Sequence, residues 1–417
     1  MFKNLRSKKN TGKVYQNYLY LLLIQGTNLV LPLITFPYLV RVLGSEKYGL
    51  VMIAYSLMKF FIITVDFGFN ISATREVALL KNDKRKLSKF YWNVLIIKGL
   101  LLILTFLILL TLTISIDKLK LDPLIYLLSF GLVFGQSIFP TWFFQGIEKM
   151  QVITIINVIA KVFFTITIFF IVLSPQDYYY VPILNGIGFI LAGILGFLYS
   201  LKYVKLILPS IEEIKNNVSK TFSLFISNLA VSLYTSSNTL ILGFFIGDSV
   251  AGVYASMEKL TQAIQTMYTP IYQALFPNLS TKPVKEIRKT ISKMKIPIAL
   301  SGLLISGIIF LGSETILRII FNDDLITSYY KVFQLIGLMA FFSSLNMLYV
   351  TLYFPAIKKY ETRMKILVSG GFFNLILALS LVKSFSIYGV ASSAILTELF
   401  VLLFAIYFYK KTINEKV

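Results

Sequence analysis

Most of the chain consists of apolar stretches that are each long enough to cross a lipid bilayer. A transmembrane helix needs about 20 apolar residues, with a range of about 17–25. Backbone groups in lipid must bond within their own segment, and a helix satisfies this requirement. We therefore expect an all-α polytopic membrane protein with twelve transmembrane helices, near residues 15–40, 48–69, 91–114, 121–144, 150–173, 178–201, 221–246, 250–277, 296–312, 331–355, 364–382 and 388–409.

Composition excludes several other classes of protein. Only 14% of the 417 residues are charged, 57% are hydrophobic and the mean hydropathy is +0.77, whereas soluble domains carry roughly 25% charged residues. A soluble enzyme and a disordered chain are therefore excluded. The chain has no cysteine and no histidine, so it has no disulfide framework, no Cys/His metal site and no histidine-based triad. No cofactor is indicated.

Positive charge is concentrated in every second connection between the apolar stretches. If both termini are cytoplasmic, 29 of the 40 lysines and arginines lie within or beside cytoplasmic segments, and six lie in the outer loops. This asymmetry follows the positive-inside rule. The net charge of +21 is thus explained by topology, and nucleic-acid binding is disfavoured.

The two halves of the chain resemble each other. The turn Gly44–Gly49 matches Gly247–Gly252 at an offset of 203, and residues 143–149 match 353–359 at an offset of 210. Six spans in each half make a parallel repeat, which places substrate near the bilayer midplane between two lobes. We expect pseudo-symmetric six-helix lobes at residues 1–205 and 221–417, joined by a cytoplasmic linker at 206–220.

Several ionisable residues fall inside the expected spans. Lys59, Lys161, Lys259 and Glu398 lie deep in the apolar stretches, where each ionisable group costs about 2.5–3.5 kcal/mol if it faces lipid. They should instead face water or a partner. Lys98 lies nearer a span end, and we expect it to extend its amine to the cytoplasmic interface.

Uncharged polar residues occur at helical spacing in the same spans. They predict a water-filled central cavity shared by the two lobes, although hydrogen bonds between helices are the alternative explanation for such residues. The three deep lysines favour the cavity. The predicted substrate-binding residues are Lys59, Lys161, Lys259, Gln25, Asn28, Asn228, Thr235 and Gln262.

A second group of residues is predicted to act in coupling or gating. Asp66 lies too far along its helix from Lys59 for a direct pair, and Glu258 points about 100° away from Lys259. Glu398 is either a protonated group in an apolar bundle or a coupling carboxylate. Arg75 is expected in a loop beside Glu76, or at a cytoplasmic gate. The candidates are Asp66, Arg75, Glu258 and Glu398.

Buried lysines favour an anionic cargo. A phosphate or pyrophosphate group would pair with amines, which act as point charges. Outward movement of an anion gains about 2.3 kcal/mol per charge per 100 mV when the cell interior is negative. No phosphate-binding loop of an ATPase occurs in the sequence.

Four segments resemble signatures of O-antigen and capsule flippases, the polysaccharide-transport branch of the multidrug/oligosaccharidyl-lipid/polysaccharide exporter superfamily. They are FPYLVRVLGSEKYG (36–49), DFGF (66–69), TRE (74–76) and PTWFFQGIEKM (140–150). The resemblance covers essentially the whole chain. It implies twelve helices in two lobes that alternate access.

The resemblance also implies a cargo and a location. The cargo is an undecaprenyl-pyrophosphate-linked oligosaccharide repeat unit of O-antigen or capsule, which is flipped from the cytoplasmic to the outer leaflet. An ion gradient or the membrane potential would drive this step. The implied location is the bacterial cytoplasmic (inner) membrane. Membrane lipids are expected partners, and polysaccharide polymerase machinery is a candidate partner.

Two other functions remain open at this point. One is a multidrug or small-molecule antiporter of the same superfamily, although such exporters often carry an acidic residue in the first helix and this chain has none there. The other is a membrane enzyme such as a polysaccharide polymerase. The longest outer loop, near 313–330, is short for that role, so we expect a transporter and no enzymatic activity.

Overall fold

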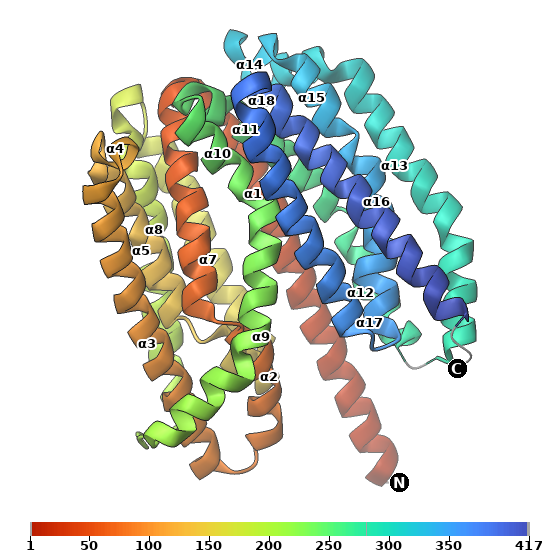
Figure 1. Cartoon of the computed structure of the whole chain (residues 1–417). Helices are drawn as coiled ribbons and strands as arrows, with labels where there is room; N and C mark the ends of the chain where they lie inside the picture. The colour runs from red at the N-terminus through yellow and green to blue at the C-terminus, as the bar shows by residue number, and fades with distance from the viewer. Residues whose placement is uncertain (1, 281, 415–417) are drawn as a thin grey trace. The chain divides into compact units, whose positions relative to one another are not determined.

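The computed structural model describes residues 2–280 and 282–414; the side chains of residues 2–22, 24, 25, 28, 234, 270, 273, 274, 277, 278 and 414 lie outside that description. Every regular element within these residues is a helix (Figure 1), which confirms the all-α prediction. The chain forms two compact units. Unit 1 comprises Met1–Thr35 and Leu57–Asn228, and unit 2 comprises Phe36–Ser56 and Leu229–Val417.

These units group the chain differently from the expected lobes. Residues 36–56 belong to unit 2 although they lie in the first half of the sequence, and the boundary near 228 falls inside a helix. Part of the expected linker at 206–220 is also helical, because that helix begins at Ile211. The division of the chain into two equal lobes stays a prediction.

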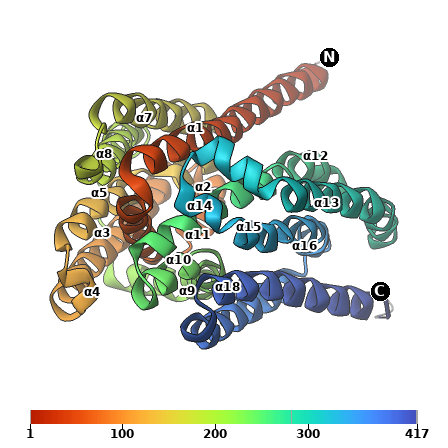
Figure 2. The same ribbon diagram turned by 90° about the horizontal axis from the view of Figure 1, so that it is seen from above.

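Unit 1 is built around a row of long helices. In Figure 2 these follow one another as α7, α8, α5 and α3, and neighbours in this row pack together. Short helix α6 packs on α2 and α7. The helices of the first part of the chain are α1 (Phe2–Asp66), α2 (Phe69–Leu80), α3 (Lys84–Ser115), α4 (Asp117–Lys120), α5 (Pro123–Ile138), α6 (Thr141–Gly146), α7 (Met150–Ile171), the 3₁₀ helix η1 (Pro175–Tyr179), α8 (Tyr180–Ser200) and α9 (Ile211–Thr235).

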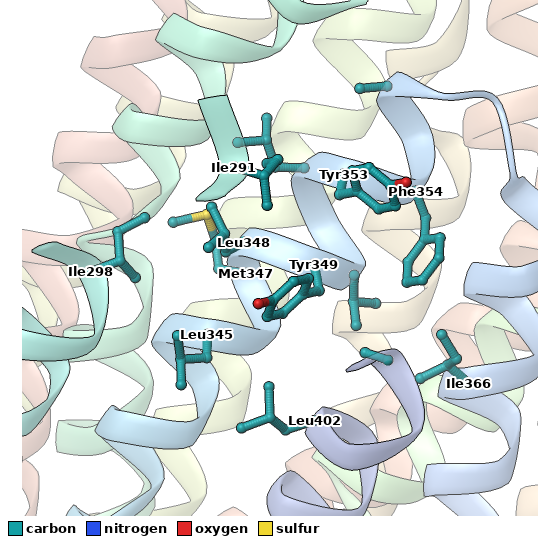
Figure 3. Close-up of a cluster of buried hydrophobic side chains, with 14 of the residues drawn as sticks. Ile291, Ile298, Leu345, Met347, Leu348, Tyr349, Tyr353, Phe354, Ile366 and Leu402 are labelled. Atoms are coloured by element: carbon teal, nitrogen blue, oxygen red, sulfur yellow. The ribbon is translucent and has the colours of Figure 1, made fainter. Parts of the chain in front are cut away.

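Unit 2 contains a second row, in which α13 packs on α15 and α16, and these pack on α18 (Figure 2). Large apolar side chains of α13, α16, α18 and the π-helix η2 fill its core (Figure 3). The helices are α10 (Ser237–Phe245), α11 (Asp248–Thr266), α12 (Thr269–Leu279), α13 (Val284–Phe321), α14 (Asp324–Ser328), α15 (Tyr330–Gly337), α16 (Met339–Asn346), η2 (Met347–Tyr353), α17 (Phe354–Ala356) and α18 (Tyr360–Asn414).

In the described residues, eight helical stretches are long and apolar enough to cross a membrane. Two of them, Leu29–Leu80 and Tyr360–Ile413, have 52 and 54 residues. Such lengths correspond to about 80 Å of helix, far more than a hydrocarbon core of about 30 Å. Non-helical dihedral angles at Gly44 and Ser386 break the long helices α1 and α18 inside these stretches. The chain is a multi-pass membrane protein, and the count of twelve spans stays a prediction.

One pair of matching turns supports the internal repeat. Glu148 (φ 61°) and Lys358 (φ 60°) occupy equivalent positions at the offset of 210, and both are left-handed. The next amide in each turn reaches back five residues, from Lys149 to Phe144 O at 2.8 Å and from Lys359 to Phe354 O at 2.9 Å. Both turns are therefore the same Schellman-type helix ending.

Glycines explain the second pair of matching turns. Gly44 (φ 71°) and Gly247 (φ 139°) both adopt positive φ values that side chains disfavour. Gly49 and Gly252 then pack against each other within unit 2, and a Cβ on Gly252 would lie 3.0 Å from the Cα of Gly49. The contact is reciprocal, because a Cβ on Gly49 would overlap the carbonyl oxygen of Asp248 and one on Gly252 would overlap that of Ser45.

Arg41 caps the C-terminal end of α13 near this contact. Its Nη2 donates to the carbonyls of Ile319 (2.8 Å) and Ile320 (2.7 Å), and its Nε donates to that of Phe321 (3.1 Å). The last carbonyls of a helix lack partners inside the helix, and a cation there is favoured by the helix dipole. The segment 36–49 thus has a structural role in unit 2.

We predict that Gly49→Ala lowers the free energy of unfolding by about 1–3 kcal/mol, because the added methyl group overlaps backbone that has to shift. Gly307→Ala is the matched control, since nothing lies within 4 Å of a Cβ added to this α13 glycine. Thermal unfolding in detergent measures both. Equal melting of the two variants would contradict the close contact.

Candidate functional site

Unit 1 contains a cavity of about 330 Å³ whose lining is partly charged. Helices α1, α2, α3, α5, α6, α7 and α8 contribute to it, together with the segment between α5 and α6. Apolar side chains form the rest of the wall. The charged and polar lining residues are Asp66, Lys98, Lys161, Asn70, Gln136, Ser137, Thr141 and Asn157.

An ion pair crosses from α1 to α3 in this cavity. Lys98 Nζ lies 3.8 Å from Asp66 Oδ1, and the two side chains are only 5% and 13% exposed. The prediction that Lys98 extends to the interface is therefore wrong. A buried ammonium group needs a compensating charge, and Asp66 supplies it because α1 ends there, directly before the left-handed residues Phe67 and Gly68.

Lys161 is the second cation of this cavity. It lies half-buried on α7, one helical turn after Asn157, so both side chains share one face of the helix. The Asn157 amide donates to the carbonyl of Ile153 at 2.9 Å. The cavity therefore combines two amines with one carboxylate, and the lining carries a net positive charge when all three are ionised.

The segments 66–76 and 140–150 meet at the edge of this cavity. Thr141 donates to Asn70 Oδ1 at 2.9 Å, and Thr74 donates to Gln145 Oε1 at 3.3 Å. A Cβ on Gly146 would lie 2.8 Å from the carbonyl oxygen of Thr74. Hydrogen bonds and close packing thus join α2 to α6. Arg75 lies on α2 and is exposed, so the expectation that it lies in a loop is wrong.

Unit 2 contains a separate cavity of about 370 Å³, between α11, α12, α16, η2 and α18. Glu398 lines it and is 2% exposed. Asn346 Nδ2 donates to Glu398 Oε2 at 2.6 Å and to the Glu398 backbone carbonyl at 3.0 Å. Glu398 was predicted from the sequence, whereas Asn346 was not.

The other predicted charged residues line neither of these cavities. Lys59 is exposed on α1. Lys259 is half-buried on α11, with its Nζ 5.1 Å from the centre of the Phe36 ring, a distance typical of a cation–π contact. Glu258 accepts a hydrogen bond from Thr239 at 3.3 Å.

The predicted uncharged residues are likewise outside the two cavity linings. Thr235 donates to the Val231 carbonyl of its own helix at 3.1 Å. Asn228 and Gln262 are half-buried. The side chains of Gln25 and Asn28 fall outside the described residues.

Buried polar residues of α10, α11 and α18 form hydrogen bonds with one another. Asn374 Nδ2 donates to Asn238 Oδ1 at 2.9 Å, Asn238 Nδ2 donates to Tyr254 Oη at 3.0 Å, and Thr397 donates to Asn374 Oδ1 at 3.3 Å. All four residues are buried. Hydrogen bonds between helices therefore satisfy these four polar side chains.

Sequence reasoning missed Gln136 and Asn157 as lining residues. Asn157 was detectable, because it lies four residues before Lys161 and so on the same helix face. Gln136 lies with Ser137 in an otherwise apolar stretch. Only the packing of α5 against its neighbours turns Gln136 toward the cavity.

Comparisons with known proteins agree with this architecture. A curated relative from Escherichia coli (strain K12), named "Putative O-antigen transporter", is 29% identical over 399 residues, which cover 93% of this chain and 95% of the relative. Its name is that of a transporter and not of an enzyme.

Solved transporters share the fold. A multidrug resistance MATE family transporter of the MOP superfamily, in an inward-facing conformation, aligns with a TM-score of 0.70 and 14% identity, covering 93% of this chain and 96% of that one. The lipid II flippase MurJ, in an inward closed conformation, aligns with a TM-score of 0.67 and 15% identity, covering 94% and 87%. The superfamily resemblance predicted from the sequence is confirmed at the level of fold.

A family model described as "Polysaccharide biosynthesis protein" matches residues 14–282, more than half of the chain. The chain belongs to this polysaccharide biosynthesis protein family.

Proposed function

We propose that the protein is a flippase for lipid-linked oligosaccharides. Its cargo would be an undecaprenyl-pyrophosphate-linked repeat unit of O-antigen or capsule, moved from the cytoplasmic to the outer leaflet of the bacterial inner membrane by alternating access. Both termini would be cytoplasmic. The observation that carries the proposal is the cavity of unit 1, where Lys161 and Lys98 line a polar space inside apolar helices.

Charge supports an anionic headgroup as the ligand. Two lysines and one aspartate leave an excess positive charge, and the side-chain amides of Asn157 and Gln136 provide hydrogen-bond donors for phosphate oxygens. We also propose Lys59 and Lys259 as further cations on the path, with Gln25, Asn28, Asn228, Thr235 and Gln262 as polar contacts.

The membrane potential suits this direction of transport. A negative charge that leaves an inside-negative cell gains about 2.3 kcal/mol per 100 mV. An ion gradient would add to this term through the candidates Asp66, Arg75, Glu258 and Glu398. A polysaccharide polymerase would then take up the flipped unit.

A multidrug antiporter is the second candidate, and the fold shared with a multidrug resistance transporter favours it. Cationic drugs would need carboxylates to dominate the binding cavity. In unit 1 the carboxylate of Asp66 is instead outnumbered by amines. The charge of this cavity therefore favours the flippase.

We predict that Lys161→Gln lowers the export of surface glycan about tenfold or more. A hydrogen bond to a charged group contributes about 1.5–3 kcal/mol, and 1.4 kcal/mol corresponds to a factor of ten. Glycan at the cell surface is measured in a strain that lacks its own flippase. Lys59→Ala and Lys259→Ala are expected to lower export as well.

Two controls make this test specific. Lys161→Arg keeps the charge and should retain most of the export, whereas Lys331→Gln removes an exposed lysine at the start of α15 and should change nothing. The abundance of each variant in the membrane is measured alongside. If the Lys161→Gln variant exports glycan normally, the lysine-based flippase is excluded. The same holds if this variant loses drug resistance and not glycan export.

The Lys98–Asp66 pair gives a separate prediction. Asp66→Asn or Lys98→Met alone should lower the free energy of unfolding by about 3–5 kcal/mol, because each leaves a buried charge without its partner. The double variant should regain most of this stability. Because it lacks one of the two amines, the stable double variant should still export less glycan than wild type. Single variants that melt like wild type would show that the pair is not buried.

A further inference from the structure

The connection between α8 and α9, residues 201–210, exposes large apolar side chains outside the candidate membrane spans. Leu206 and Leu208 are 71% and 69% exposed, and Ile211 at the start of α9 is 73% exposed. Such side chains are poorly suited to water. The backbone of the connection is irregular, and lipid-exposed irregular backbone does not occur in a hydrocarbon core. The connection therefore suits the boundary between lipid headgroups and acyl chains.

Hydrogen bonds fix this connection on α3. Trp92 Nε1 donates to the carbonyl of Lys205 at 2.9 Å, and the amide of Lys205 donates to Ser88 Oγ at 3.0 Å. The first turns of α9 lie at the lower end of unit 1 in Figure 1, where Lys89 of α3 pairs with Glu213 of α9 at 2.8 Å. Tryptophan is enriched where a membrane meets water, so Trp92 agrees with an interfacial position.

Two lysines and two tyrosines form a cluster at the start of this connection. Lys149 Nζ donates to Tyr203 Oη at 2.6 Å and lies 4.7 Å from the centre of that ring. Lys202 Nζ lies 4.8 Å from the centre of the Tyr199 ring. Both distances are typical of cation–π contacts. The Tyr203 hydroxyl donates to Tyr199 Oη at 3.4 Å, and these four residues are termed the Lys–Tyr cluster.

The fold holds this cluster in place. The amide of Lys149 donates to the Phe144 carbonyl at 2.8 Å, in the Schellman-type turn. The Tyr199 ring packs on that of Phe144, with centroids 5.9 Å apart, and the Tyr203 ring packs on that of Phe143, with centroids 6.1 Å apart. Groups that are already ordered lose less conformational entropy when a ligand binds.

The charge of the cluster favours an anionic ligand. Neither Lys149 nor Lys202 forms an ion pair with a carboxylate in the described part of the chain. Glu148, the acidic residue next to Lys149, pairs with Lys81 at 2.8 Å. An ammonium group has three donors, and Lys149 uses one of them on Tyr203. Donors of both amines are thus available to an anion.

We propose that this end of unit 1 binds an anionic phospholipid, with the headgroup phosphate at the Lys–Tyr cluster and the acyl chains beside Leu206, Leu208 and Ile211. Lysine binds phosphate as a point charge, and basic pockets between membrane helices bind anionic headgroups. A phospholipid fits better than free phosphate, because only a lipid also covers the exposed leucines.

This lipid site is distinct from the site proposed for the cargo. No residue of the Lys–Tyr cluster lines the cavity around Lys161. In the proposed topology, with both termini cytoplasmic, the connection after α8 faces the cytoplasm. The ligand is therefore a phospholipid of the cytoplasmic leaflet.

Tryptophan fluorescence tests this site. The chain has two tryptophans: Trp92 is hydrogen-bonded to the connection, whereas Trp142 is fully buried. The purified full chain is reconstituted into phosphatidylcholine vesicles that contain phosphatidylglycerol with brominated acyl chains, since bromine quenches only nearby indole rings. Brominated phosphatidylcholine at the same mole fraction is the comparison. These vesicles contain no lipid-linked sugar, so the cargo does not contribute to the signal.

We expect phosphatidylglycerol to associate beside Trp92 about fivefold or more tightly than phosphatidylcholine. The double variant Lys149→Gln/Lys202→Gln should lose this preference, and Lys149→Arg/Lys202→Arg should keep it because the charges remain. Trp92→Phe should remove the lipid-dependent part of the quenching.

A matched control separates a specific site from general surface charge. Lys86→Gln/Lys289→Gln removes two exposed lysines from the first turns of α3 and α13, which the proposed topology also places on the cytoplasmic side. This variant should keep the preference. Lys202→Gln alone should lower it about twofold or more, and because Lys202 is exposed, this variant decides the test if the double variant does not fold.

Three results would overturn the inference. One is equal quenching of wild type by the two brominated lipids, and another is a preference that persists in Lys149→Gln/Lys202→Gln. The third is an equal loss of preference in Lys86→Gln/Lys289→Gln, because the preference would then follow total charge. Glycan export by Lys161→Gln tests the cargo separately, so each proposal can fail without the other.

Discussion

The low polarity of the bilayer core governs where charged groups of this chain are found. An ionised side chain that faces hydrocarbon costs several kcal/mol, so each one must meet an opposite charge, a hydrogen-bond donor or a polar cavity. Unit 1 meets this requirement with the Lys98–Asp66 pair and a polar cavity around Lys161. In unit 2, the carboxylate of Glu398 accepts a hydrogen bond from the Asn346 amide.

The internal repeat shows how local sequence determines the ends of the helices. A positive φ value at Gly44 and at Gly247 lets the chain turn at equivalent points, and the glycines five residues later allow the following helices to touch. At the other repeated turn, Glu148 and Lys358 adopt the same left-handed conformation without glycine. The hydrogen bond that reaches back five residues stabilises this ending, so its geometry is kept although the side chains differ.

The sequence predicts local features well, but it does not predict which distant residues contact each other. Apolar length predicts the helices, and glycine spacing predicts the matching turns, because both depend on neighbouring residues. Lys98 is 32 residues from Asp66, and Asn346 is 52 residues from Glu398, so both pairs depend on how distant helices pack. The same limit applies to polar stripes: hydrogen bonding accounts for Asn238, whereas a cavity accounts for Lys161, and the two cases look alike in the sequence.

Under the proposed function, the excess positive charge of the cavity in unit 1 has one energetic consequence. A ligand shifts a conformational equilibrium only by the difference in its affinity for the two states. A diphosphate that leaves the cell moves favourably in an inside-negative potential, by about 2.3 kcal/mol per charge per 100 mV. The excess of lysines in the cavity of unit 1 would therefore let the membrane potential drive the outward step. A carboxylate site for a cationic drug moving outward would have to work against that potential.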